Sequence, residues 1–365
     1  MKILHFFPPH DTAIGEYVSM IEAQQNTLGA EVATCTSVNE AARLLADFSP
    51  SIVHIHGGWS VSIALVARLT MGKGVRYVYS PQGQLQPWII KEKSPKIKKL
   101  HMAIYQRWAC MHAACLIGMG KMEVTSLGNL KLNRHIETIR NPLFTESISC
   151  KEAARQTIAV YQKVLDTSTL ELMDNDTIET MSALIKVGIC GDKRWIEVSE
   201  QQRVGALNYI QWRQVILHAH YHNISDIIEK GARIIGVTMP EIDITTMPTY
   251  NKPAQRPDEA IGTDVSGASK MIWLIQQAQE ASDNGMLSFC HLTDIAKTIY
   301  NERIDEQRLE QLLADRGMTL YAQRLMALLE RYTDINEGFM PIKALYDRTA
   351  KHMLKPDTLT KCIRL

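Results

Sequence analysis

Two histidines and two glycines close a short apolar run, Ile-Val-His-Ile-His-Gly-Gly-Trp at residues 52–59. Alternate side chains of a strand share a face, so His54 and His56 would point the same way. An imidazole, with an unperturbed pKa of ~6.5, can act as a base or hydrogen-bond a ligand hydroxyl. We therefore predict His56 as a catalytic residue; the alternative is a hydrogen-bonded histidine at a strand end. Gly57 and Gly58 either let the backbone approach a ligand or form a turn.

A proline-rich polar loop follows the next apolar run and reads Ser-Pro-Gln-Gly-Gln-Leu-Gln-Pro-Trp at residues 80–88. Two prolines and a glycine exclude a regular element, so the chain must turn here. Its amides and indole suit a sugar-binding cleft, although an ordinary connecting loop has the same composition. We predict Gln82, Gly83 and Trp88 as substrate-binding residues.

The loop after the first apolar run, at residues 8–15, lies where α/β proteins bind phosphate at a helix N-terminus. It contributes His10 and Gly15 as candidate binding residues. A single glycine makes no dinucleotide-binding fingerprint. No cofactor is therefore expected.

A basic segment, Lys91–Lys99, precedes an amphipathic stretch with aromatic residues. Such a segment can rest on an anionic membrane surface, attract ligand phosphates, or form a solvated face. Nucleic acid is the weakest alternative, because no recognition motif accompanies the charge.

Metal binding is not predicted. The run His218-Ala219-His220-Tyr221-His222 lacks the cysteines or carboxylates that complete a zinc site, so these residues are interpreted as ordinary histidines. Seven scattered cysteines without a Cys-x-x-Cys pair indicate reduced thiols rather than disulfides.

The elements that would position the N-terminal residues alternate between apolar strands and helices. The expected strands are apolar without alternation, which is typical of a parallel sheet covered on both faces. Residues 1–145 are therefore predicted to form an α/β, Rossmann-like, doubly wound domain with its ligand beyond the carboxyl ends of the strands. The expected strands are 2–7, 31–36, 51–56, 75–80, 115–119 and 136–140.

The C-terminal half has a different character. Residues 146–246 are predicted to be mostly helical, with one further strand at residues 233–238. Residues 247–263 carry three prolines and form the expected linker, and residues 264–365 a helical domain.

The bulk composition is that of a globular protein, with 45% hydrophobic and 22% charged residues. A net charge of +1 conceals an asymmetry, because residues 71–140 contain 12 Lys+Arg and only 3 acidic residues. No signal peptide is recognised and no apolar window reaches the ~18–20 residues that span a bilayer. A cytoplasmic location is expected, with membrane contact at the inner face through Lys91–Lys99 as one alternative.

Taken in order, four pieces resemble the acceptor-side domain of family 4 glycosyltransferases, retaining enzymes of the GT-B fold. They are the first strand with its Pro-Pro loop, residues 52–59, the loop at 80–88, and Ile139-Arg140-Asn141-Pro142. In that family the Ser-Pro-x-Gly-x-Leu-x-x-Trp loop lines the inter-domain cleft and the Asn-Pro step ends the first domain. The resemblance adds Asn141 to the candidate binding residues.

The resemblance covers about 40% of the chain and departs from the family in the donor half. The paired glutamates that grip the nucleotide-sugar are not recognisable, and the position often held by His or Arg is Gln82. A second parallel sheet within residues 151–250 would supply a donor domain, whereas helices there would favour a protein without one.

The resemblance implies a glycosyltransferase-like protein that moves a sugar from a nucleotide-sugar to a glycan or lipid-linked acceptor in surface-polysaccharide assembly. The alternative is a non-catalytic descendant that binds a glycan or a partner glycosyltransferase. The sequence is compatible with both alternatives and does not decide whether the chain is an enzyme.

Overall fold

The computed structural model describes residues 1–9, 11–92, 95–244 and 266–354, with no account of the side chains of residues 90–95 and 351. The described chain divides into two compact units after Thr167. The N-terminal unit, here called the sheet domain, extends beyond the expected boundary at residue 145. The second, here called the helical unit, begins at Ser168. The expected linker at 247–263 lies outside the described residues.

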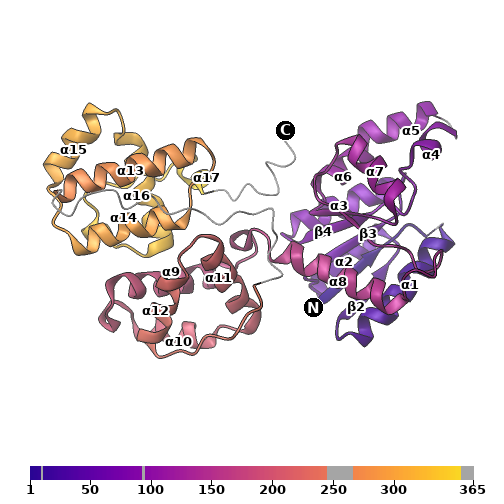
Figure 1. The fold of residues 1–365 in the computed structure, drawn as a ribbon, viewed down its shortest axis with the longest axis horizontal. Coiled ribbons are helices and arrows are strands. Elements are labelled where there is room, and N and C mark those ends of the chain that lie inside the picture. The colour runs from indigo at the N-terminus through magenta and orange to yellow at the C-terminus, as the bar shows by residue number, and fades with distance from the viewer. Residues whose placement is uncertain (10, 93–94, 245–265, 355–365) are drawn as a thin grey trace. The chain divides into compact units, whose positions relative to one another are not determined.

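The sheet domain contains one parallel sheet, which confirms the predicted α/β fold (Figure 1). Among the described residues, six strands lie in the order β2-β1-β3-β4-β5-β6. The chain reverses direction across the sheet between β1 and β3, and this reversal creates the crevice in which doubly wound proteins bind ligands. The strands are β1 (Lys2–Phe6), β2 (Glu31–Cys35), β3 (Ile52–His56), β4 (Arg76–Ser80), β5 (Cys115–Gly118) and β6 (Ile136–Thr138).

Helices cover both faces of the sheet, as strands with apolar residues on both faces require. One apolar core lies beneath α2, α3, α6 and α7, and the other beneath α1 and α8. Helix α8, expected in the middle region, therefore belongs to the sheet domain. The helices of this domain are α1 (Thr12–Thr27), α2 (Val38–Asp47), α3 (Val61–Gly72), α4 (Pro87–Glu92), α5 (Pro95–His101), the π-helix η1 (Met102–Gln106), α6 (Arg107–His112), α7 (Lys121–Leu130) and α8 (Cys150–Leu165).

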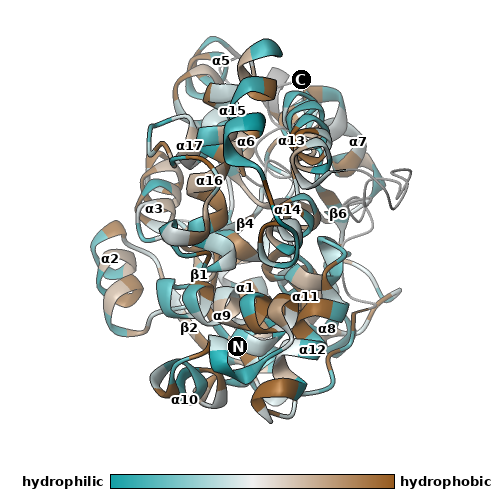
Figure 2. Cartoon of the chain, turned by 90° about the vertical axis from the view of Figure 1, so that its left-hand side faces the viewer, coloured by the Kyte–Doolittle hydropathy of each residue, from teal (hydrophilic) through white to brown (hydrophobic). Residues whose placement is uncertain are grey.

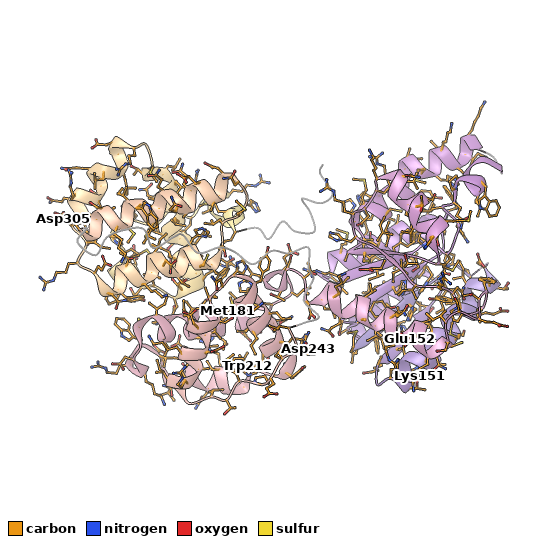
Figure 3. All side chains as sticks on the ribbon, viewed as in Figure 1. Lys151, Glu152, Met181, Trp212, Asp243 and Asp305 are labelled. Carbon is orange, nitrogen blue, oxygen red and sulfur yellow. The ribbon has the colours of Figure 1, made fainter. Side chains whose placement is uncertain are left out.

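The helical unit has one core, to which residues on both sides of the undescribed segment contribute. Met181 of α9 and Trp212 of α11 are both buried in it (Figure 3). The two helical regions expected as separate domains therefore pack as one. The elements are η2 (Thr169–Glu171), α9 (Asn175–Cys190), η3 (Lys193–Trp195), α10 (Val198–Ala206), α11 (Tyr209–Tyr221), α12 (Ser225–Ile235), α13 (Gly267–Asp283), α14 (Phe289–Asn301), α15 (Glu306–Asp315), α16 (Thr319–Thr333), η4 (Glu337–Phe339) and α17 (Ala350–Met353).

The strand predicted at residues 233–238 is wrong, because residues 225–235 form α12. A short apolar run such as Ile234-Ile235 cannot be assigned by periodicity alone. The helices of this unit contain both hydrophilic and hydrophobic residues (Figure 2), as is typical of helices that bury one face.

Two glycines allow α9 and α12 to cross at close range. A Cβ on Gly188 would lie 2.1 Å from the carbonyl oxygen of Ile227, and one on Gly231 would lie 2.2 Å from that of Leu184. Neither neighbour is a flexible side-chain end, so the helices themselves would have to separate.

Replacing Gly188 by alanine is therefore expected to lower the free energy of unfolding of the helical unit by about 1–3 kcal/mol, the usual cost of overpacking. Urea denaturation followed by circular dichroism measures it. Gly205→Ala is the matched control, since Gly205 lies in α10 with open space around it. Helix propensity alone should make that control more stable, by about 0.5–1 kcal/mol. Equal effects of the two substitutions would contradict the close crossing.

No helix within the described ranges combines the length and the apolar character required to cross a membrane. Within the same ranges the cysteines are free thiols, as predicted; Cys362 lies outside them.

Candidate functional site

A cavity of about 480 Å³ lies at the carboxyl ends of β1 and β3, where the strand order reverses. Three loops and four helical elements line it. The loops after β1, β3 and β4 contribute Pro8 and Asp11, residues 57–60, and Gln84. The helical elements α1, α3, α5 and η1 contribute Ile14, Val61, His101 and Tyr105. Of the residues predicted for binding, the structure brings Gly57 and Gly58 to this cavity.

The backbone after β3 has a left-handed conformation at two positions of this wall. Gly57 has φ +89°, a conformation that favours glycine, and a Cβ there would also lie only 3.1 Å from Ile14 Cδ1. Trp59 has φ +59°, which costs a residue with a side chain of order 1–3 kcal/mol. Three hydrogen bonds hold it: its N–H donates to Gln106 Oε1 at 3.0 Å, its Nε1–H donates to the Gln84 carbonyl at 2.8 Å, and its own carbonyl accepts from the Tyr105 hydroxyl at 2.8 Å.

The loop at 80–88 begins with a tight turn. Gln84 N–H donates to the Pro81 carbonyl at 3.1 Å, and the two central residues, Gln82 and Gly83, both have positive φ, at 56° and 79°. Positive φ at both central positions is the pattern of a type I′ turn. Glycine adopts a positive φ readily, whereas Gln82 must be held in this conformation by its surroundings.

A buried carboxylate from α7 holds this loop from below. Glu123 accepts hydrogen bonds from the Gly83 N–H at 2.6 Å and from the Met119 N–H at 2.8 Å. Burial raises the pKa of the Glu123 carboxyl, and the two N–H groups counteract this. Glu123 thus joins the loop after β4 to the loop after β5.

A single π-helical turn, η1, interrupts the long helix that flanks the cavity. π-Helical turns are rare in proteins, and those that do occur often lie at functional sites. This one buries Gln106, whose Nε2 donates to the Tyr79 hydroxyl at 2.6 Å while its Oε1 accepts from Trp59. The same turn places Tyr105 against the cavity.

The polar groups of the cavity centre on Asp11 and Gln84. Asp11 caps α1 by accepting from the Ile14 N–H at 3.2 Å, and its second oxygen accepts from Gln84 Nε2 at 2.7 Å. An ionised carboxylate offers about four lone-pair positions, so two remain for a ligand hydroxyl. Ser60, which also lines the cavity, is the N-cap of α3 but makes no side-chain capping hydrogen bond, so the positive end of that helix lies at the cavity.

Three buried histidines lie together beneath this site. His5 on β1 pairs in register with His54 on β3, and His56 follows on the same face, as strand alternation predicted. His5 Nδ1 lies 2.8 Å from His56 Nε2, and His5 Nε2 lies 2.9 Å from Gln25 Oε1. His56 Nδ1 lies 3.2 Å from Gln82 Nε2.

The hydrogen-bond partners of each ring show which of its nitrogens carries the proton, and with that assignment the hydrogen bonds all run in one direction. Gln82 Nε2 donates to His56, His56 Nε2 donates to His5, and His5 Nε2 donates to Gln25. His54 is bound separately, to the Tyr161 hydroxyl at 2.6 Å and the Ser80 hydroxyl at 2.7 Å. Every ring nitrogen of the three histidines therefore has a hydrogen-bond partner.

Burial keeps the three rings neutral. Desolvation lowers the pKa of His5 to about 4, and desolvation together with the neighbouring rings lowers the pKa of His54 and of His56 well below the usual value. One ring nitrogen from each of the three histidines lies within 4.8 Å of the other two, a spacing at which the three nitrogens could ligate a metal ion. The hydrogen bonds account for the cluster without one. His56 faces Gln82 rather than the cavity, so its catalytic role stays a prediction.

The other predicted residues that the structure describes do not line the cavity. Gly15 is in the first turn of α1 beside Phe7, and Trp88 is exposed at the start of α4. Asn141 is buried and accepts from the Leu143 N–H at 2.9 Å, which makes it a turn residue. His10 lies outside the described residues, as do the side chains of residues 91–95 in the basic segment.

In the helical unit, His218 and His222 share a buried face of α11, as helical spacing requires. His222 Nδ1 lies 2.7 Å from the Ser288 hydroxyl, and both rings contact Phe289. These are contacts within the core of the helical unit.

Sequence reasoning missed Asp11, Gln84 and Glu123. A signal existed for the first, since an aspartate after Pro-Pro and before a helical stripe is a good N-cap. Gln84 stood inside the loop already singled out. The contact of Glu123 with Gly83 gave no local signal, because Gly83 lies 40 residues earlier.

Comparison with known families agrees with this geometry. Residues 16–142 match the family model described as a glycosyl transferase 4-like domain, which confirms the expected resemblance for the N-terminal region. No curated protein and no solved structure matches the chain.

Proposed function

From this glycosyl transferase 4-like domain, we propose that the protein takes part in the transfer of a sugar from a nucleotide-sugar to a glycan or lipid-linked acceptor in surface-polysaccharide assembly. The observation that carries the proposal is the cavity at the strand reversal. Its lining residues from Gly57 onward lie in the region that matches the family, whereas Pro8, Asp11 and Ile14 precede that region. In the proposal, this cavity holds the acceptor, on the inner, cytoplasmic side of the membrane.

The cavity has the groups that recognise sugars. The Asp11 carboxylate and the Gln84 amide can accept from and donate to neighbouring hydroxyls, and Trp59 supplies an aromatic wall. The glycine backbone at 57–58 lets a ligand approach closely. The N-terminus of α3 stabilises negative charge, which suits the phosphate of a donor or of a lipid-linked acceptor.

The test is calorimetric titration and turnover of the full chain with UDP-, GDP- and ADP-sugars. We expect one nucleotide class to bind and its sugar to be released or transferred. If no nucleotide binds, the transferase proposal fails.

A second candidate function is favoured by the helical unit. Residues 168–244, where the sequence left room for a second parallel sheet, are helical. A protein of this kind would bind a glycan or a partner glycosyltransferase without turnover. Sugar transfer by the purified chain would refute it, whereas glycan binding without nucleotide binding would support it.

Either function predicts that Asp11 contributes to sugar affinity. Asparagine at position 11 keeps a good N-cap but removes the charge, so affinity for a bound sugar should fall roughly ten- to hundredfold, the value of a charge-assisted hydrogen bond. Saturation-transfer NMR with the methyl glycosides of glucose, galactose, mannose and N-acetylglucosamine measures it.

The matched control is Asp305→Asn, at the N-cap of α15 in the helical unit (Figure 3). It makes the same chemical change at a helix start outside the cavity and should leave sugar affinity unchanged. If both variants bind like the wild type, Asp11 is a helix cap and nothing more.

A further inference from the structure

A narrow apolar groove lies on the sheet domain between α3 and the helix that carries η1. Its volume is about 220 Å³, and its walls include Val61, Leu65 and Arg68 from α3 and Ile104 and Trp108 from the facing helix. The cavity described above does not require this groove, so it needs its own explanation.

The groove and its rim expose apolar side chains that a free surface would not favour. Ile104 is 64% exposed, Val61 54% and Leu65 46%, and Ile97 and Leu100 continue the apolar surface along α5. Contiguous exposed apolar side chains rimmed by polar groups mark binding surfaces for apolar partners.

The two helical segments that form the groove are basic. Residues 61–72 and 95–112 contain no aspartate or glutamate, and they carry Arg68, Lys96, Lys98, Lys99 and Arg107. The Arg68 guanidinium lies 5.4 Å from the centre of the Trp108 ring in the groove, and Lys98 Nζ lies 5.4 Å from that of Trp59 in the cavity. These basic side chains therefore favour an apolar partner that carries negative charge.

The groove adjoins the cavity, because Val61 and Tyr105 line both. One molecule with a polar head and an apolar chain can therefore occupy the two together.

We propose that the groove binds the hydrocarbon chain of a prenyl phosphate-linked acceptor, with its phosphate beside the basic side chains and its sugar in the polar cavity. The inference rests on the proposed function, in which an acceptor occupies that cavity. It selects the lipid-linked acceptor over a soluble glycan.

The experiment titrates the full chain with farnesyl phosphate below its micellar concentration. Farnesol, inorganic phosphate and vesicles of phosphatidylglycerol with phosphatidylcholine are separate arms. Farnesyl phosphate should bind at least tenfold more tightly than either farnesol or inorganic phosphate, because it engages both the apolar walls and the cations. Binding to vesicles alone would indicate a flat membrane-contact surface and overturn the proposal.

Ile104→Asp places a carboxylate in the groove at an exposed position where folding is not at risk. It should weaken farnesyl phosphate binding tenfold or more, which is about 1.4 kcal/mol. Met122→Asp is the matched control, since Met122 is 77% exposed on α7 and does not line the groove. Equal affinities of the Ile104→Asp and wild-type chains would overturn the proposal.

The outcome is separable from that of the proposed function. Nucleotide-sugar binding and transfer to a soluble glycan, without farnesyl phosphate binding, would remove the lipid groove and leave the transferase. Farnesyl phosphate binding without any nucleotide binding would keep the groove and remove the transferase.

Discussion

Replacing Glu123 by alanine is expected to lower the free energy of unfolding of the sheet domain by up to about 6 kcal/mol and to release the loop at residues 80–88. The substitution leaves the Gly83 and Met119 N–H groups without their acceptor. A buried N–H without a partner costs about 1–3 kcal/mol. The loop should lose its turn as well, because Gln82 keeps its positive φ only through its surroundings.

Hydrogen exchange of the Gly83 and Met119 amides, together with urea denaturation, measures this effect. Glu123→Gln should be intermediate, since one amide oxygen remains as an acceptor. The control is Glu152→Gln, on the surface of α8 (Figure 3), which should change stability by no more than about 0.5 kcal/mol. Unchanged exchange at Gly83 in Glu123→Ala would show that the loop is held by other contacts.

Acid should destabilise the sheet domain between pH 6.5 and about pH 4. His5, whose pKa burial lowers from 6.5 to about 4, stays neutral in the fold over this range, whereas in the unfolded chain it takes up a proton. The unfolded state then binds more protons, so stability falls as the pH falls. Each such histidine contributes up to about 1.4 kcal/mol per pH unit. His54 and His56, with their pKa values also lowered by burial, act in the same direction.

The measurement is a series of denaturation curves from pH 7.5 to pH 4.5, with NMR of the histidine ring protons. In the folded chain the three rings should not titrate above pH 5, and in 6 M guanidinium the same rings should titrate near the unperturbed pKa of ~6.5. A folded His54 or His56 titrating near 6.5 would mean that water reaches the cluster, and would contradict the buried hydrogen-bond chain.

Local patterns were sufficient for the sheet and for the position of its site. Apolar runs without alternation, each followed by a helical stripe, predicted the parallel sheet. Pro-Pro and Gly-Gly after two of the strands marked the loops that line the cavity. These features are local: a strand buried on both faces, or a turn with positive φ, restricts the residue types at the position itself.

Contacts between distant segments could not be predicted in this way. Nothing in the sequence around Glu123 indicates that its carboxylate accepts from Gly83, and nothing around His5 indicates that it joins His56. Both depend on strand order, which places β1 beside β3 and β4 beside β5. For the same reason the sequence placed His56 on the correct face of its strand but could not show that Gln82 contacts it.

The sequence by itself determined the class of the N-terminal domain, its resemblance to family 4 glycosyltransferases and the end of the sheet at which the cavity lies. Only the tertiary structure decided which side chains reach the cavity, that the histidines form a buried neutral chain, and that a basic apolar groove adjoins the cavity. The physical reason is the distance along the chain over which each effect acts. Periodicity and turn chemistry act over a few residues, whereas a cavity forms where segments up to about a hundred residues apart are brought together by the packing of the sheet.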